Sequence, residues 1–77
     1  MISPVRESLL ASNEEFRRLV QEHAQYSQRL DSLSQKPYPS DDEKLEAVRL
    51  KKLKLRLKDQ MQTLEQQYRQ AHPENVA

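Results

Sequence analysis

The chain has no cysteine, so thiolate chemistry is excluded. The residues that could still carry chemistry are two histidines, several carboxylates and one run of basic residues. His23 falls within an apolar repeat, where a histidine could carry a proton or bind a ligand. A metal site needs several converging ligands, and the helical neighbours of His23 include no second histidine and no carboxylate. We therefore expect a partly buried packing residue, with no metal and no cofactor. The other histidine, His72, stands before a proline and is expected to close a helix.

The carboxylates gather where helices would begin. Glu14–Glu15 and Asp41–Glu43 lie in first turns, where capping and the helix dipole favour acidic side chains. No pair lies in an apolar pocket that would separate two pKa values for acid–base work. No serine carries a nucleophile signature. We therefore expect no catalytic residue, and a protein that is not an enzyme.

The basic run, defined as the six cations between Ala47 and Lys58, contains no acid. On a helix its members divide between two faces, one with Arg49, Lys52 and Arg56 and one with Lys51, Lys54 and Lys58. Clustered cations could bind nucleic-acid phosphates, although the run has no aromatic residue to stack on bases. The alternative is a solvated face that pairs with acids of the facing helix or of a second subunit, namely Glu14, Glu15, Glu22 and Asp31. The net charge of +1 favours this alternative.

The amino-acid composition indicates that these residues lie on helices. The chain of 77 residues is long enough for one small domain and contains no glycine, so tight turns and a β-rich fold are very unfavourable. Glu, Lys, Arg, Gln, Leu and Ala dominate, and these residues lose least on entering a helix. The fold class predicted for residues 1–77 is therefore all-α, in a single domain.

Capping residues and prolines set the boundaries of the predicted helices. Ser3 followed by Pro4 starts a short helix over about 4–11. A capping box on Ser12 with Glu15 then starts a second helix over about 13–35, after a break in the chain. Two prolines mark a loop at 36–40, and a second capping box, on Ser40, starts a helix over about 41–71. We expect residues 73–77 to form a disordered tail.

Apolar spacing predicts how these helices pack. The second helix carries a heptad stripe from Phe16 to Leu33, and the third carries one from Leu50 to Tyr68. A short loop makes the pair an antiparallel, coiled-coil-like hairpin, with Leu19 near Leu57 and Leu33 near Leu45. The short first helix would cover the overhanging end of the third by placing its leucines, Leu9 and Leu10, against Leu64 and Tyr68.

A second apolar stripe on the third helix, Leu45, Val48 and Leu55, cannot be covered by the same partner helix. Self-association into a four-helix bundle would cover it, and so would another protein. We predict a homodimer. The chain has no apolar stretch long enough for a signal peptide or a membrane span, so we expect a cytoplasmic protein without a membrane partner.

Several segments give the chain a family resemblance. The segment from Leu9 to Leu19, the pair Glu22-His23, and the segment from Leu50 to Met61 resemble the YdcH-like family of small bacterial proteins, a domain of unknown function. Within them the matching motifs are Phe16 with Leu19, Glu22-His23, and Leu55 to Met61. Family members often carry an aspartate shortly after the histidine, where this chain has Tyr26. The resemblance implies a helical hairpin from a bacterial cytoplasm and supplies no activity.

Asp59 and His23 are the polar residues expected to fix the register of the hairpin. Arg56, Thr63, or a cation of the facing helix such as Arg17 or Arg18, could meet the Asp59 carboxylate. Taken together, the sequence predicts a non-enzymatic helical interaction protein that acts through its apolar stripes and its basic face. The alternative is a nucleic-acid-associated protein that binds phosphates through residues 49–58.

Overall fold

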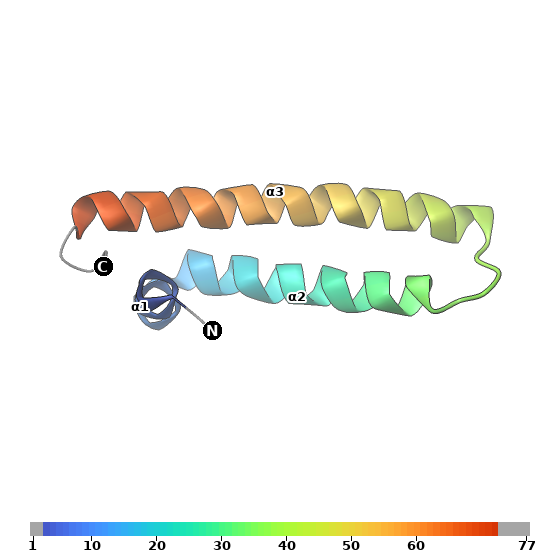
Figure 1. Ribbon diagram of the computed structural model, residues 1–77, viewed down its shortest axis with the longest axis horizontal. Coiled ribbons are helices and arrows are strands. Elements are labelled where there is room, and N and C mark those ends of the chain that lie inside the picture. The colour runs from blue at the N-terminus through green and yellow to red at the C-terminus, as the bar shows by residue number, and fades with distance from the viewer. Residues whose placement is uncertain (1–2, 73–77) are drawn as a thin grey trace.

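The computed structural model describes residues 3–72, and these form three helices (Figure 1). They are α1 (Pro4–Ser12), α2 (Glu14–Ser34) and α3 (Asp41–Ala71). α2 and α3 lie side by side and antiparallel, joined by the loop 35–40. α1 lies at the other end of the hairpin, under the last turns of α3, and is seen nearly end-on in Figure 1. The all-α hairpin is thus confirmed, while the tail predicted at 73–77 lies outside the described residues.

α1 begins as its sequence predicts. The Ser3 side chain accepts a hydrogen bond from the Arg6 N–H at 3.2 Å, and Pro4 takes the first helical position. Proline costs nothing there, because its missing N–H would have had no acceptor within the helix.

The start of α2 differs from the prediction. Asn13 interrupts the helices with extended backbone (φ −120°, ψ 110°), and its side chain accepts from the Phe16 N–H at 2.9 Å. The predicted capping box on Ser12 with Glu15 is wrong. α1 continues through Ser12, whose hydroxyl donates to the Ser8 carbonyl at 2.7 Å. A residue with helical backbone dihedrals cannot serve as the N-cap, so the cap moves one residue along the chain.

The core forms where all three helices meet. Phe16 and Leu19 of α2 are the most deeply buried side chains, at 0% and 1% exposure. Residues from the other two helices complete the cluster, namely Val5, Leu9, Leu57 and Met61. Leu10, Leu64 and Tyr68 pack against it and are partly buried. α1 therefore covers the overhanging end of α3, as the sequence predicted.

Arg6 connects α1 to both long helices. Its guanidinium carbon lies 5.8 Å from the centroid of the Phe16 ring, within the range of a cation–π contact. Its Nε is buried and has no hydrogen-bond acceptor, and the nearest carboxylate oxygen, Glu65 Oε1, lies 4.0 Å away. At this distance the contact with Glu65 is electrostatic, so both contacts depend on the charge of Arg6.

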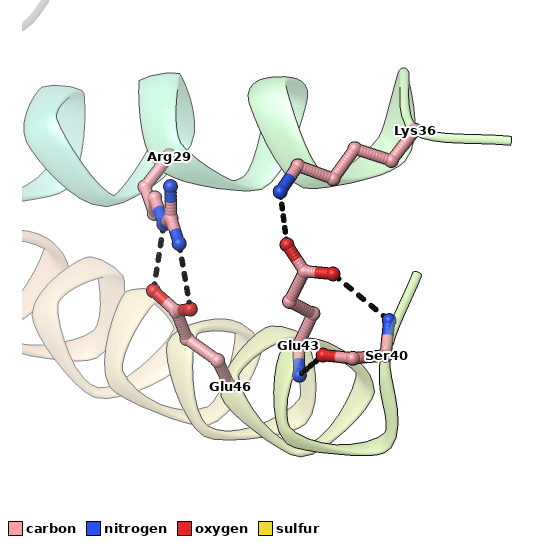
Figure 2. Close-up of polar contacts among 5 residues, drawn as sticks. All are labelled: Arg29, Lys36, Ser40, Glu43 and Glu46. Atoms are coloured by element: carbon pink, nitrogen blue, oxygen red, sulfur yellow. Dashed lines mark hydrogen bonds and ion pairs between the residues drawn. The ribbon is translucent and has the colours of Figure 1, made fainter. Parts of the chain in front are cut away.

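Polar contacts close the loop end of the hairpin (Figure 2). Ser40 and Glu43 form the predicted capping box: the Ser40 hydroxyl accepts from the Glu43 N–H at 3.1 Å, and the Glu43 carboxylate accepts from the Ser40 N–H at 2.8 Å. The same carboxylate accepts from the Lys36 ammonium. One turn further along α3, Arg29 of α2 binds Glu46 through two hydrogen bonds.

The two predicted pairs of the hairpin, Leu19 with Leu57 and Leu33 with Leu45, differ in burial. Leu19 and Leu57 belong to one cluster, as expected. Leu33 is buried, but Leu45 is half exposed, and Lys44 and Ala47 line the groove beside Leu33 instead. Leu33 thus lies at the level of Leu45 along the hairpin, as predicted, but Leu45 lies on a more exposed side of α3 than the residues that line this groove.

Candidate interaction surface on the third helix

The outer stripe, defined as Leu45, Val48 and Leu55, remains on the surface. These side chains are 50%, 48% and 61% exposed, whereas Leu50 and Leu57 of the same helix are buried. The difference follows from helical geometry, since α2 and α1 cover one side of α3 and leave the opposite side open. The outer stripe is therefore apolar surface that no described part of the chain covers.

The basic run flanks the outer stripe on both sides. Arg49, Lys52 and Arg56 line one shallow groove together with Leu53. The other three cations line a second groove together with His23 and Leu55, namely Lys51, Lys54 and Lys58. The two faces predicted from helical spacing are thus both present in the structure.

None of these six cations forms an ion pair or a side-chain hydrogen bond within residues 3–72. The ion pairs of that part of the chain use other cations, Arg6 with Glu65, Arg29 with Glu46 and Lys36 with Glu43. Pairing with acids of the facing helix, which the sequence favoured, is therefore absent from the described part of this chain. The surface around the outer stripe keeps its positive charge.

His23 is partly buried between α2 and α3 and faces the second groove. Burial lowers the pKa of its imidazole, and the nearby positive charges of Lys54, Arg6 and Lys58 lower that pKa further. Both effects disfavour the imidazolium form. His23 is thus a partly buried residue whose pKa is lowered by its packing and by the cations around it.

Asp59 lies on the exposed side of α3. Its backbone carbonyl accepts from the Thr63 hydroxyl at 3.0 Å, and its carboxylate makes no ion pair or hydrogen bond within residues 3–72. Arg17, one expected partner, instead donates to the carbonyls of Leu10 and Ala11 at the end of α1. The register-fixing role predicted for Asp59 therefore has no contact within residues 3–72 to support it.

His72 follows the last turn of α3, as predicted for a helix-end residue. Its Nδ1 lies 3.2 Å from the Tyr68 carbonyl oxygen, and its ring stacks on the Tyr68 ring with centroids 4.2 Å apart. The contact closes the end of the helix.

The described residues do not bring metal ligands together. In residues 3–72 no group of three or more His, Asp or Glu side chains is placed to hold a metal ion. None of the helices in that range has the apolar stretch that a bilayer crossing requires.

Fold and surface together define a small helical hairpin protein whose long helix has an uncovered side. The model of the DUF465 family, described as a protein of unknown function, matches residues 16–65. The chain belongs to this family, which confirms the YdcH-like resemblance of its sequence. The match spans nearly all of α2, the loop and most of α3. No curated protein and no solved structure gives a significant match to the chain.

Proposed function

We propose that this protein is a non-enzymatic helical interaction protein that binds another protein through the outer surface of α3. The observation that supports the proposal is the outer stripe itself, three large apolar side chains left about half exposed on one helix. Contiguous apolar surface with a charged rim is typical of protein–protein contacts. Helix-in-groove recognition uses the same pattern of anchors at heptad spacing.

A homodimer is part of this proposal. A lone hairpin of 77 residues has a thin core, and a second copy would cover apolar surface that water now contacts. Two hairpins that associate through α3 would form a four-helix assembly, with the two copies of α3 in its middle.

The alternative function is phosphate binding on a nucleic acid, and one observation favours it. All six cations of the basic run lack an acidic partner within residues 3–72, so their charge is available to a polyanion. Binding of this kind weakens steeply with added salt, because it depends on the release of counterions. An apolar helix contact depends on salt only weakly.

A tagged protein used as bait in a bacterial lysate separates the two functions. The outer-stripe variant replaces Leu45, Val48 and Leu55 with Gln, and the basic-run variant replaces Arg49, Lys52 and Arg56 with Gln. A control replaces two exposed cations outside the run and away from the outer stripe, Arg18 and Arg69, with Gln. Capture is measured at low and moderate salt, with and without nuclease, and circular dichroism confirms that each variant is helical.

We expect the tagged chain to capture a protein, and this capture should persist in nuclease and moderate salt and be lost with the outer-stripe variant. Nucleic acid that leaves with salt, and is lost with the basic-run variant but not with the control, would support the alternative instead. Equal capture by the wild type and the outer-stripe variant would refute the proposed function.

A further inference from the structure

The outer stripe belongs to a longer line of exposed residues along the first half of α3. Asp41, Leu45, Val48, Lys52 and Leu55 follow one another at spacings of four, three, four and three, which is the heptad spacing of a coiled-coil seam. All five are exposed. An acidic residue at the start of the line and a basic residue near its end make the seam electrically asymmetric. This asymmetry restricts how a second copy can align with it.

A parallel pairing of two such seams is unfavourable. It would place Lys52 against Lys52 and Asp41 against Asp41 of the second copy, and like charges in contact repel. An antiparallel pairing avoids both contacts, because the acidic start of one helix then faces the basic part of the other. Three antiparallel registers, separated by one heptad each, would bring the seams together.

Charge selects one of these registers. In the first, Leu45 of one copy meets Val48 of the other, Asp41 faces Lys52, and Asp42 lies beside Arg49. In the second, Leu45 meets Leu55, but Asp41 faces Asp59 and Arg49 lies beside its own counterpart. The third places Val48 against Asp59 and Leu45 against Gln62, so the apolar side chains find no apolar partner.

We infer that two copies of this chain associate through an antiparallel contact between the first halves of their α3 helices, in the register that pairs Asp41 with Lys52. The inference rests on the proposed function, and it names a second copy as the occupant of the outer stripe. Leu55 of each copy then reaches the loop before the other α3. That loop contains Tyr38, whose side chain is 93% exposed.

The same geometry sets the strength of the dimer. The helices overlap over residues 41–52, a length of about 18 Å at the helical rise. One flank also brings Lys44 beside Lys51 of the second copy, and these charges repel. A short contact with one repulsive flank produces a weak dimer that depends on concentration and salt.

Sedimentation equilibrium of the purified full chain tests the dimer and its charge pairing. We expect the apparent mass to rise with concentration from 9.1 kDa toward twice that value. Lys52→Glu alone and Asp41→Lys alone should each weaken association at least tenfold, and an equimolar mixture of the two variants should restore it. Lys54→Glu is the matched control, because it makes the same charge change on the side that faces His23. Circular dichroism checks that each variant stays helical.

Engineered disulfides test the register, since the chain contains no cysteine of its own. A mixture of the Leu45→Cys and Val48→Cys proteins should form mixed disulfides under mild oxidation faster than a mixture of Leu45→Cys and Leu55→Cys. The reverse order would overturn the inferred register. So would equal weakening by Lys52→Glu and Lys54→Glu.

A wild-type chain that stays monomeric at every concentration would overturn self-association. That result would also remove the homodimer from the proposed function, whereas binding of another protein through the outer stripe would stand if the outer-stripe variant still lost a captured partner. A dimer that forms as inferred, combined with capture of no other protein, would leave the second copy as the partner.

Discussion

Arg29 and Glu46 form a two-point contact between α2 and α3, with Nε to Oε2 at 2.7 Å and Nη2 to Oε1 at 2.9 Å. The parallel geometry matches the planar guanidinium to the carboxylate, and a lysine cannot reproduce it. The contact is open to solvent, so its role is to align the helices more than to stabilise the fold.

Exchange of the two charges tests this relationship. Arg29→Glu should lower the melting temperature slightly, because it faces Glu46 with a like charge. The double variant Arg29→Glu/Glu46→Arg should recover most of the loss. Thermal unfolding at low and high salt measures both effects. A double variant that melts no higher than Arg29→Glu would show that the pair does not act as a unit.

Acid should weaken the loop end of the hairpin. The hydrogen bond from Lys36, and after it the Ser40 backbone N–H, lower the pKa of Glu43 from 4.5 to about 2. A lowered carboxyl pKa stabilises the folded state above the unfolded value, and this stabilisation is lost as the pH falls from about 4.5 to about 2. Denaturation at a series of pH values checks the prediction. Glu43→Gln should flatten that part of the profile, and an unchanged slope would contradict it.

His23 should titrate below its ordinary value of 6.5, because burial and the charges of Lys54, Arg6 and Lys58 disfavour its imidazolium. A lowered histidine pKa means that the unfolded chain binds the proton more tightly. The free energy of unfolding is therefore not reduced by His23 above pH 6.5, and it decreases as the pH falls below that value.

Proton NMR of the imidazole measures this pKa directly, and Lys54→Gln is the informative variant. Removal of that charge should move the His23 pKa up toward 6.5. Arg18→Gln, an exposed cation that is not among the causes of the shift, is the control and should leave the pKa in place. Equal shifts in both variants would show a general effect of net charge.

Asn13 should matter more than Ser12 for the start of α2. Asn13→Ala removes the acceptor of the Phe16 N–H, and loss of an N-cap costs about 0.5–2 kcal/mol. Ser12→Ala removes only a hydroxyl that donates within α1, and should change stability little. Urea denaturation of the two variants compares them. A larger loss of stability with Ser12→Ala than with Asn13→Ala would show that Ser12 caps α2, as the sequence predicted.

Asp59→Ala should leave the melting temperature unchanged or slightly raised, because the carboxylate has no partner within residues 3–72 and alanine favours the helix. Asp59→Asn is the conservative control. A clear drop in melting temperature with both variants would establish the register-fixing role that the sequence predicted. Differential scanning calorimetry is a suitable measurement.

The sequence by itself determined the helices. The caps at Ser3 and Ser40, the prolines of the loop and the heptad stripe that starts at Phe16 act over a few residues, so their effects can be read along the chain. The exposure of the outer stripe could also be predicted from helical spacing, because one neighbouring helix cannot cover two apolar faces of α3.

The tertiary structure decided which side chains meet. Helical spacing divides the basic run between two faces, but only the packed hairpin shows that Lys54 and Lys58 face His23 while Glu46 pairs with Arg29. Likewise, only the observed end of α1 moves the cap from Ser12 to Asn13. Such contacts depend on the rotation and register of one helix against another. These are set by the packing of the whole core, which no local pattern specifies.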